Sequence, residues 1–121
     1  MKLGLAMIFA KDMGRMTAFY REALALPFLA DESSEGWAVF DAGGARLALH
    51  AIPAAIAQGI AITEPPRARA EGAIKLVFHA ADLEAARARL VAHGAVMFDP
   101  RVSGSCDGLD PEGNVFQIQR G

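Results

Sequence analysis

The feature that most constrains this chain is an internal duplication. The segments "FDAGGARLAL" (40–49) and "LDPEGNVFQI" (109–118) begin 69 residues apart, and both read apolar-Asp-x-x-Gly followed by an alternating run. Asp12 and Asp82, which can each cap a helix, are 70 residues apart. The order strand, helix and three strands therefore occurs twice. A unit this small buries the apolar face of its sheet poorly, so the two copies are predicted to pair.

Hydrophobic periodicity and turn residues place the individual elements. The first copy is predicted to contain a helix over 13–25 and strands over 3–10, 28–30, 36–41 and 45–51. The second copy is predicted to contain a helix over 83–93 and strands over 73–80, 95–98, 103–109 and 114–119. Residues 52–73, rich in Ala, Pro and Arg, indicate a connector with one short helical turn near 53–58.

These elements predict an α+β fold: two tandem βαβββ modules forming one curved mixed sheet that encloses a cup, with helices on its outer face. The whole chain, 1–121, is interpreted as one domain. Module one covers about 1–51, the connector 52–73 and module two 74–121.

Composition excludes several classes of function. The 121 residues carry a formal net charge of -2 and no basic stripe with interleaved aromatics, so nucleic acid is not expected as a partner. The apolar runs are too short for a membrane span, and the N-terminus reads as a strand and not as a signal peptide. Cys106 is the single cysteine, expected to be a small buried thiol, and this usage fits a reducing cytoplasm.

Alternation along the strands predicts which side chains face away from the helices. This set mixes apolar and polar residues, as a small-molecule pocket does. It consists of Leu5, Met7, Phe9, Arg46, Ala48, His50, Lys75, Val77, His79, Val115, Gln117 and Gln119.

The segments "FYREALALP" (19–27), "KLVFHAADLEAARARLVAHGA" (75–95) and "LDPEGNVFQIQ" (109–119) resemble the vicinal oxygen chelate superfamily. That superfamily includes glyoxalase I, bleomycin resistance proteins, fosfomycin resistance enzymes and extradiol dioxygenases. In its metal-dependent members the ligands, typically His or Gln and Glu, come from the first and fourth strands of each unit. By the register of the repeat these positions are Leu5, Ala48, Lys75 and Gln117 here.

These four residues do not suit a divalent metal. Leucine and alanine offer no lone pair, a protonated lysine repels the ion, and the single amide oxygen of Gln117 is not a site. We therefore expect no metal and no cofactor. The resemblance then implies a protein that binds a small organic molecule in a metal-free cup, as bleomycin resistance proteins sequester a drug. It also implies a homodimer. The expected ligand contacts are Met7, Phe9, His50, Lys75, His79 and Gln117.

Other interpretations remain open, and the sequence does not decide between an enzyme and a binding protein. His50 or His79 could be the base of a glyoxalase-like isomerase or lyase, with or without a divalent metal. Lys75 could bind an anion or simply reach solvent as a strand-end lysine. Trp37 could stack on a ligand, together with Met7 and Phe9, or serve packing. A scaffold whose pocket has closed with apolar side chains is the third alternative.

Overall fold

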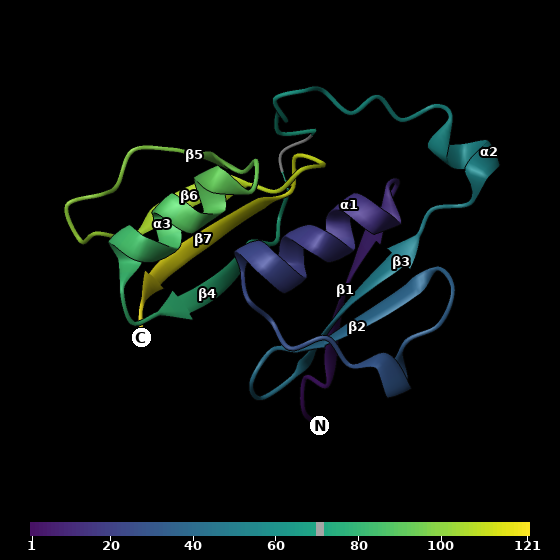
Figure 1. Ribbon diagram of the computed structural model, residues 1–121, viewed down its shortest axis with the longest axis horizontal. Coiled ribbons are helices and arrows are strands. Elements are labelled where there is room, and N and C mark those ends of the chain that lie inside the picture. Colours follow the sequence, from purple (N-terminus) through teal and green to yellow (C-terminus); the bar gives the residue numbers. More distant parts are fainter. Residues whose placement is uncertain (70–71) are drawn as a thin grey trace. The chain divides into compact units, whose positions relative to one another are not determined.

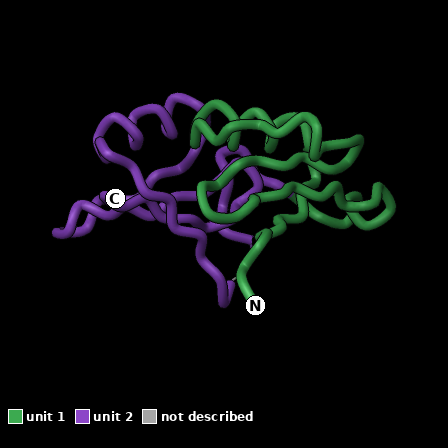
Figure 2. The backbone as a smooth tube through the Cα atoms, turned by 90° about the horizontal axis from the view of Figure 1, so that it is seen from below, with its two compact units in different colours: residues 1–61 green, residues 62–121 purple. Residues whose placement is uncertain are grey.

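A computed structural model describes residues 1–69 and 72–121. These residues form two compact units, 1–61 and 62–121, which are coloured separately in Figure 2. The predicted connector over 52–73 contains residues 70–71, which lie outside the described ranges.

Unit 1 contains a three-stranded mixed sheet and a broken helix (Figure 1). The strand order is β1-β3-β2, with β1 parallel to β3 and β2 antiparallel to β3. The elements are β1 (Leu5–Ala10), α1 (Met13–Ala18), the π-helix η1 (Phe19–Ala23), the 3₁₀ helix η2 (Ala30–Glu32), β2 (Trp37–Asp41), β3 (Arg46–Ala51) and α2 (Ala54–Ala57).

Unit 2 repeats this plan with a four-stranded sheet. The strand order is β4-β7-β6-β5, with β4 parallel to β7 and the other pairs antiparallel. The elements are β4 (Leu76–Ala80), α3 (Leu83–Ala92), β5 (Val96–Met97), β6 (Cys106–Leu109) and β7 (Val115–Arg120).

The helix starts confirm the duplication that the sequence predicted. Asp12 precedes α1, and its Oδ1 accepts a hydrogen bond of 3.0 Å from the backbone N–H of Arg15. Asp82 precedes α3, and its Oδ1 accepts from the N–H of Ala85 at the same distance. Each carboxylate thus satisfies one backbone donor that a helix start leaves open. In both units the first strand then pairs in parallel with the last.

The α+β class is confirmed, and the observed differences concern individual elements. The predicted strand over 28–30 is a single bridge between Phe28 and Phe40. The predicted helix over 13–25 is α-helical only to Ala18, because the next turn is a π-helix in which Leu24 N–H bonds the Phe19 carbonyl. The ladders of the described residues fall into two mixed sheets and not into one sheet, since β1 and β4 are each the edge strand of their own unit.

Each unit buries an aromatic core between its helix and its sheet. In unit 1 the rings of Tyr20 and Phe40 are both buried, with centroids 6.3 Å apart. In unit 2 the Phe116 ring is buried and lies 6.2 Å from Phe78. Cys106 is a buried thiol, as predicted, and its Sγ donates to the carbonyl oxygen of Phe98 at 2.8 Å. The helix stripes and the alternate strand residues therefore face these cores.

The described helices do not include one that could cross a bilayer, because none combines the required length with the required hydrophobicity.

Candidate functional site

The face of the unit 1 sheet that points away from α1 carries exposed apolar side chains. Along β1 the relative exposures are 38% for Leu5, 45% for Met7 and 53% for Phe9, whereas Ala10, on the other face, is buried. Large apolar side chains that stay half exposed on one strand face are candidates for contact with a ligand or another protein. The strand alternation predicted from the sequence is confirmed for β1.

Three rings form a row across this face. The register pairs Phe9 of β1 with His50 of β3, and His50 with Trp37 of β2. The His50 ring lies 5.6 Å from each of the other two centroids and meets both edge-to-face. We call Phe9, His50 and Trp37 the aromatic row. The aromatic row runs across the sheet from β1 through β3 to β2 and consists of two aromatic rings and one imidazole. Such an arrangement suits flat organic ligands.

The proton on His50 can be placed from its hydrogen bond. His50 Nδ1 lies 2.9 Å from the carbonyl oxygen of Ala51. A carbonyl only accepts, so Nδ1 carries the hydrogen and, in the neutral ring, Nε2 keeps its lone pair. His50 is therefore oriented as an acceptor or base toward whatever approaches the row.

In unit 2 the corresponding face carries an ion-pair cluster. The Asp107 carboxylate accepts two hydrogen bonds from the Arg101 guanidinium, at 3.1 and 2.7 Å, and one from Lys75 Nζ at 2.9 Å. We call these three residues the Asp107 cluster. The side chain of Asp107 is only 16% exposed, while Lys75 and Arg101 are 39% and 50% exposed. Lys75 therefore does not simply reach solvent, as one interpretation of the sequence had it.

These contacts shift the proton equilibrium of the carboxyl group. The hydrogen bonds from Arg101, and then those from Lys75, lower the pKa of Asp107 from 3.8 to about 2, against the opposing effect of burial. The carboxylate thus keeps its charge through the physiological range and holds both cations in place.

Two amide side chains complete this face. Gln117 lies directly across from Asp107 on one side and Val77 on the other. Its carboxamide is half-buried and makes no hydrogen bond to the described residues. Gln119 Nε2 lies 3.0 Å from His79 Nε2, so one nitrogen donates to the other. Since an amide nitrogen only donates, the His79 Nε2 is the acceptor in this pair.

The residues at the expected ligand positions do not fit a divalent metal. Ala48 is fully buried at the centre of the unit 1 face, and Leu5 is a hydrocarbon. Lys75 Nζ donates a hydrogen bond to the Asp107 carboxylate and offers no lone pair to an ion while it does so. Within residues 1–69 and 72–121 no group of three or more His, Cys, Asp or Glu side chains is arranged to hold an ion. Gln117 offers one neutral oxygen, which is not enough for Zn²⁺ or a similar ion.

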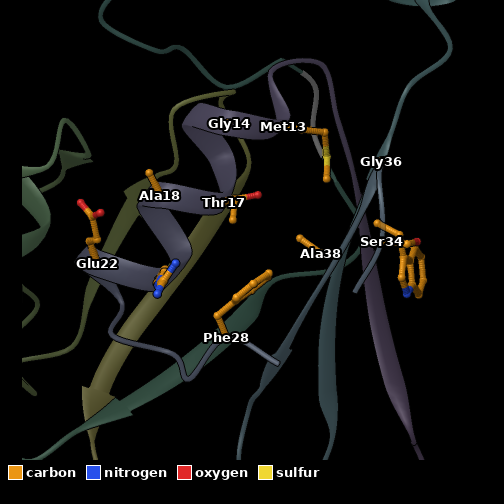
Figure 3. A pocket seen from close by; sticks show the side chains of 11 residues that line it. Met13, Gly14, Thr17, Ala18, Glu22, Phe28, Ser34, Gly36 and Ala38 are labelled. Carbon is orange, nitrogen blue, oxygen red and sulfur yellow. The ribbon is translucent and has the colours of Figure 1, made fainter. Parts of the chain in front are cut away.

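Unit 1 also has an open hollow of about 420 Å³ on the helical side (Figure 3). Its walls are α1, η1 and the segment that leads into β2, with Thr17, Glu22 and Phe28 among the side chains seen in the close-up. The Arg21 guanidinium lies 5.4 Å from the centre of the Phe28 ring, so part of the wall is already engaged. Trp37 belongs both to this hollow and to the aromatic row.

The duplicated units and their fold indicate a family, and a comparison with a family model shows which one it is. The glyoxalase-like domain model matches residues 5–119. The chain belongs to the glyoxalase-like family. This confirms the resemblance to the vicinal oxygen chelate superfamily that the sequence motifs indicated. A search of curated proteins gives no significant match.

Several solved structures share the glyoxalase-like fold. A glyoxalase/bleomycin resistance protein/dioxygenase family enzyme from Burkholderia phytofirmans PsJN superposes with a TM-score of 0.74 at 22% identity, covering 98% of this chain and 97% of the other. The fosfomycin resistance protein FosX from Mesorhizobium loti gives 0.72 at 16% identity, with 99% and 91% covered. TnmS3, an antibiotic-binding protein from Streptomyces sp. CB03234, gives 0.70 at 20% identity, with 99% and 95% covered. At these identities the likeness establishes the fold.

The predicted contact residues of this glyoxalase-like chain fall into two groups. Met7, Phe9 and His50 share the exposed face of the unit 1 sheet. His79 and Gln117 come from the paired strands β4 and β7 of unit 2, and Lys75 directly precedes β4. That these six residues contact a ligand remains a prediction.

Sequence reasoning missed two residues of the Asp107 cluster and the place of Trp37. Asp107 and Arg101 were not chosen, although Asp107 directly follows "GSC" (104–106) in a predicted strand, where alternation could have placed its side chain on the same face as Gln117. Trp37 was considered as a side chain that could stack on a ligand or serve packing, without its neighbours on the sheet. The pairing of Trp37 with His50 depends on the β2–β3 register. The "DAGG" turn between the two strands sets this register.

Proposed function

We propose that this protein binds a small, flat organic molecule on the aromatic row, without a metal ion. The single observation that carries the proposal is the row of exposed Phe9 and His50 and half-buried Trp37 across three strands. Aromatic side chains lose little conformational entropy on binding and offer large apolar surfaces with a polar edge. The antibiotic-binding neighbour TnmS3 supports a ligand of this kind for the same fold.

The absence of a metal is part of the proposal. It is supported by the chemistry of Leu5, Ala48, Lys75 and Gln117, which cannot supply a set of anionic or imidazole ligands. The ligand contacts would then be those of hydrophobic burial, stacking and a few hydrogen bonds. Met7 adds a flexible thioether beside Phe9, which adapts to irregular ligand shapes.

The binding proposal predicts a loss of affinity on truncation of the row. Trp37 is the single tryptophan, so its fluorescence reports binding when a library of planar antibiotics and aromatic metabolites is screened. For any compound that quenches it, Phe9→Ala is expected to weaken binding about tenfold, because stacking and apolar burial together contribute about 1–2 kcal/mol. Addition of EDTA is expected to leave the dissociation constant unchanged.

Ile56→Ala is the matched control, since it truncates an exposed apolar residue of α2 in the same unit. Equal affinities of the Phe9→Ala and Ile56→Ala variants would contradict binding on the aromatic row. Loss of binding in EDTA, with recovery on adding a divalent ion, would contradict the metal-free part.

A second candidate function is favoured by the orientation of His50. With Nδ1 bonded to Ala51, Nε2 is placed to accept a proton, as the base of a glyoxalase-like isomerase or lyase requires. If a screened compound is turned over, His50→Gln is expected to lower kcat by about 10² to 10⁴ while His79→Gln has a smaller effect. Product analysis by NMR measures this. Unchanged turnover in the His50 variant would leave binding as the function.

Cytoplasmic location and a homodimeric state are also proposed. The single buried cysteine supports a reducing compartment, and the family resemblance supports the dimer. Light scattering on the purified protein measures its molar mass in solution and would show a monomer if the second proposal is wrong.

A further inference from the structure

The Asp107 cluster has more positive than negative charge. One carboxylate, Asp107, is paired with two cations, Lys75 and Arg101. In unit 1 the comparable cluster has the opposite balance: Arg46 contacts the carboxylates of both Glu32 and Asp41, at 3.2 and 3.6 Å. The two sheets therefore present clusters of opposite net charge, and only that of unit 2 would attract an anion.

The three charged side chains of the cluster differ in how much of their surface is exposed to solvent. The Asp107 carboxylate is the covered group, whereas the two cations keep about four-tenths and one half of their side-chain surface accessible. The half-buried carboxylate thus fixes two cationic groups whose outer sides still face solvent. A preorganised pair of this kind loses less entropy on binding an anion than two free side chains would.

The cluster also has donors left over. An ammonium has three N–H donors and a guanidinium five. Asp107 uses one from Lys75 and two from Arg101. The carboxamide of Gln117, directly across from Asp107 on β7, makes no hydrogen bond to the described residues and can donate to the same anion. Five charged N–H groups and one amide therefore remain near one spot of the sheet.

From this geometry we infer that the Lys75–Asp107–Arg101 cluster, with Gln117, binds an oxyanion group such as a carboxylate of a small organic ligand. The inference deepens the proposed function, on which it rests for the ligand as a whole, by adding an anionic group to the ligand class. The N–H donors that Asp107 leaves on Lys75 and Arg101 carry positive charge, and this gives the site its selectivity for an anion over a neutral amide.

Benzoate and benzamide are suitable probes, because they are nearly equal in shape and differ in charge. Both are titrated into the ¹⁵N-labelled full chain and followed through the backbone amides of β6 and β7. Benzoate is expected to bind at least about fivefold more tightly than benzamide at low salt, since exposed charge-assisted hydrogen bonds contribute modestly. This preference is expected to shrink in about 300 mM NaCl. The Debye length there is about 6 Å, so the salt screens the attraction between benzoate and the cations.

Variants assign the preference to the cluster. Lys75→Gln and Arg101→Gln each leave one cation on Asp107, so the strands stay tied and the spectrum should remain dispersed. Either change is expected to bring the benzoate affinity to within about twofold of that for benzamide. Arg46→Gln is the matched control in unit 1 and is expected to keep the full preference.

Three results would overturn the inference. These are no benzoate binding, equal binding of both probes, and a benzoate preference that survives both cluster variants. In each case the cluster is a structural clamp that ties β4 to β6. Such a failure is distinct from failure of the proposed function, which Trp37 fluorescence and the Phe9→Ala variant measure in unit 1.

Discussion

Alanine at position 113 is expected to destabilise the protein by about 3 kcal/mol or more. Gly113 has a φ of +83°, a backbone conformation that costs alanine roughly 1 kcal/mol or more. A Cβ atom there would also collide with the backbone carbonyl of Arg67, which passes over the turn. Moving a backbone segment to relieve such overpacking costs a further 1–3 kcal/mol or so.

Gly43→Ala separates the two contributions. Gly43 also has a positive φ, of +98°, but a Cβ there would meet nothing within 4 Å. Its substitution is expected to cost only the conformational term of roughly 1 kcal/mol. Urea unfolding followed by circular dichroism gives both free energies of unfolding. If the two variants lose equal stability, the segment at Arg67 is not packed against the turn as the structure has it.

The Asp107→Asn variant is expected to lose about 2 kcal/mol of stability near neutral pH and much less in acid. The folded protein lowers the pKa of Asp107 to about 2, from 3.8, mainly through Arg101. A lowered carboxyl pKa stabilises the folded state fully above the unfolded value, and this stability is lost as the pH falls through the folded value. The window of loss therefore runs from about pH 4 down to about pH 2.

Unfolding in urea at about pH 6 and about pH 2.5 measures this effect. The difference between the native protein and Asp107→Asn is expected to fall to about a third at the lower pH. Asp99→Asn is the control, since it removes the same charge at an exposed position two residues before Arg101. A difference that does not change with pH would mean that the two cations do not hold the carboxylate in the folded state.

Asp12 and Asp82 show what local sequence can predict. A helix cap is decided by a side chain and the backbone three residues later, so spacing alone reveals it. Strand faces follow in the same way, because alternation is a property of each strand. The positions of Met7 and Phe9 on the face away from the helix were predicted on these grounds.

Phe28 and Lys75 show where local reasoning ends. The segment 28–30 has a strand composition, but it makes one bridge to Phe40 and then turns into a 3₁₀ helix. Lys75 was predicted to be either solvated or bound to an anion. In the structure it bonds Asp107, 32 residues away along the chain. Neither outcome is encoded in a short window, because both depend on which strands lie next to each other.

The sequence by itself determined the duplicated plan and most of the strand and helix types, because each depends on residue type and spacing. The tertiary structure alone decided that Trp37 completes a row with His50 and Phe9, and that one carboxylate holds two cations. The physical reason is that strand register brings residues distant in sequence within a few ångströms. Only those short distances turn separate side chains into a binding surface.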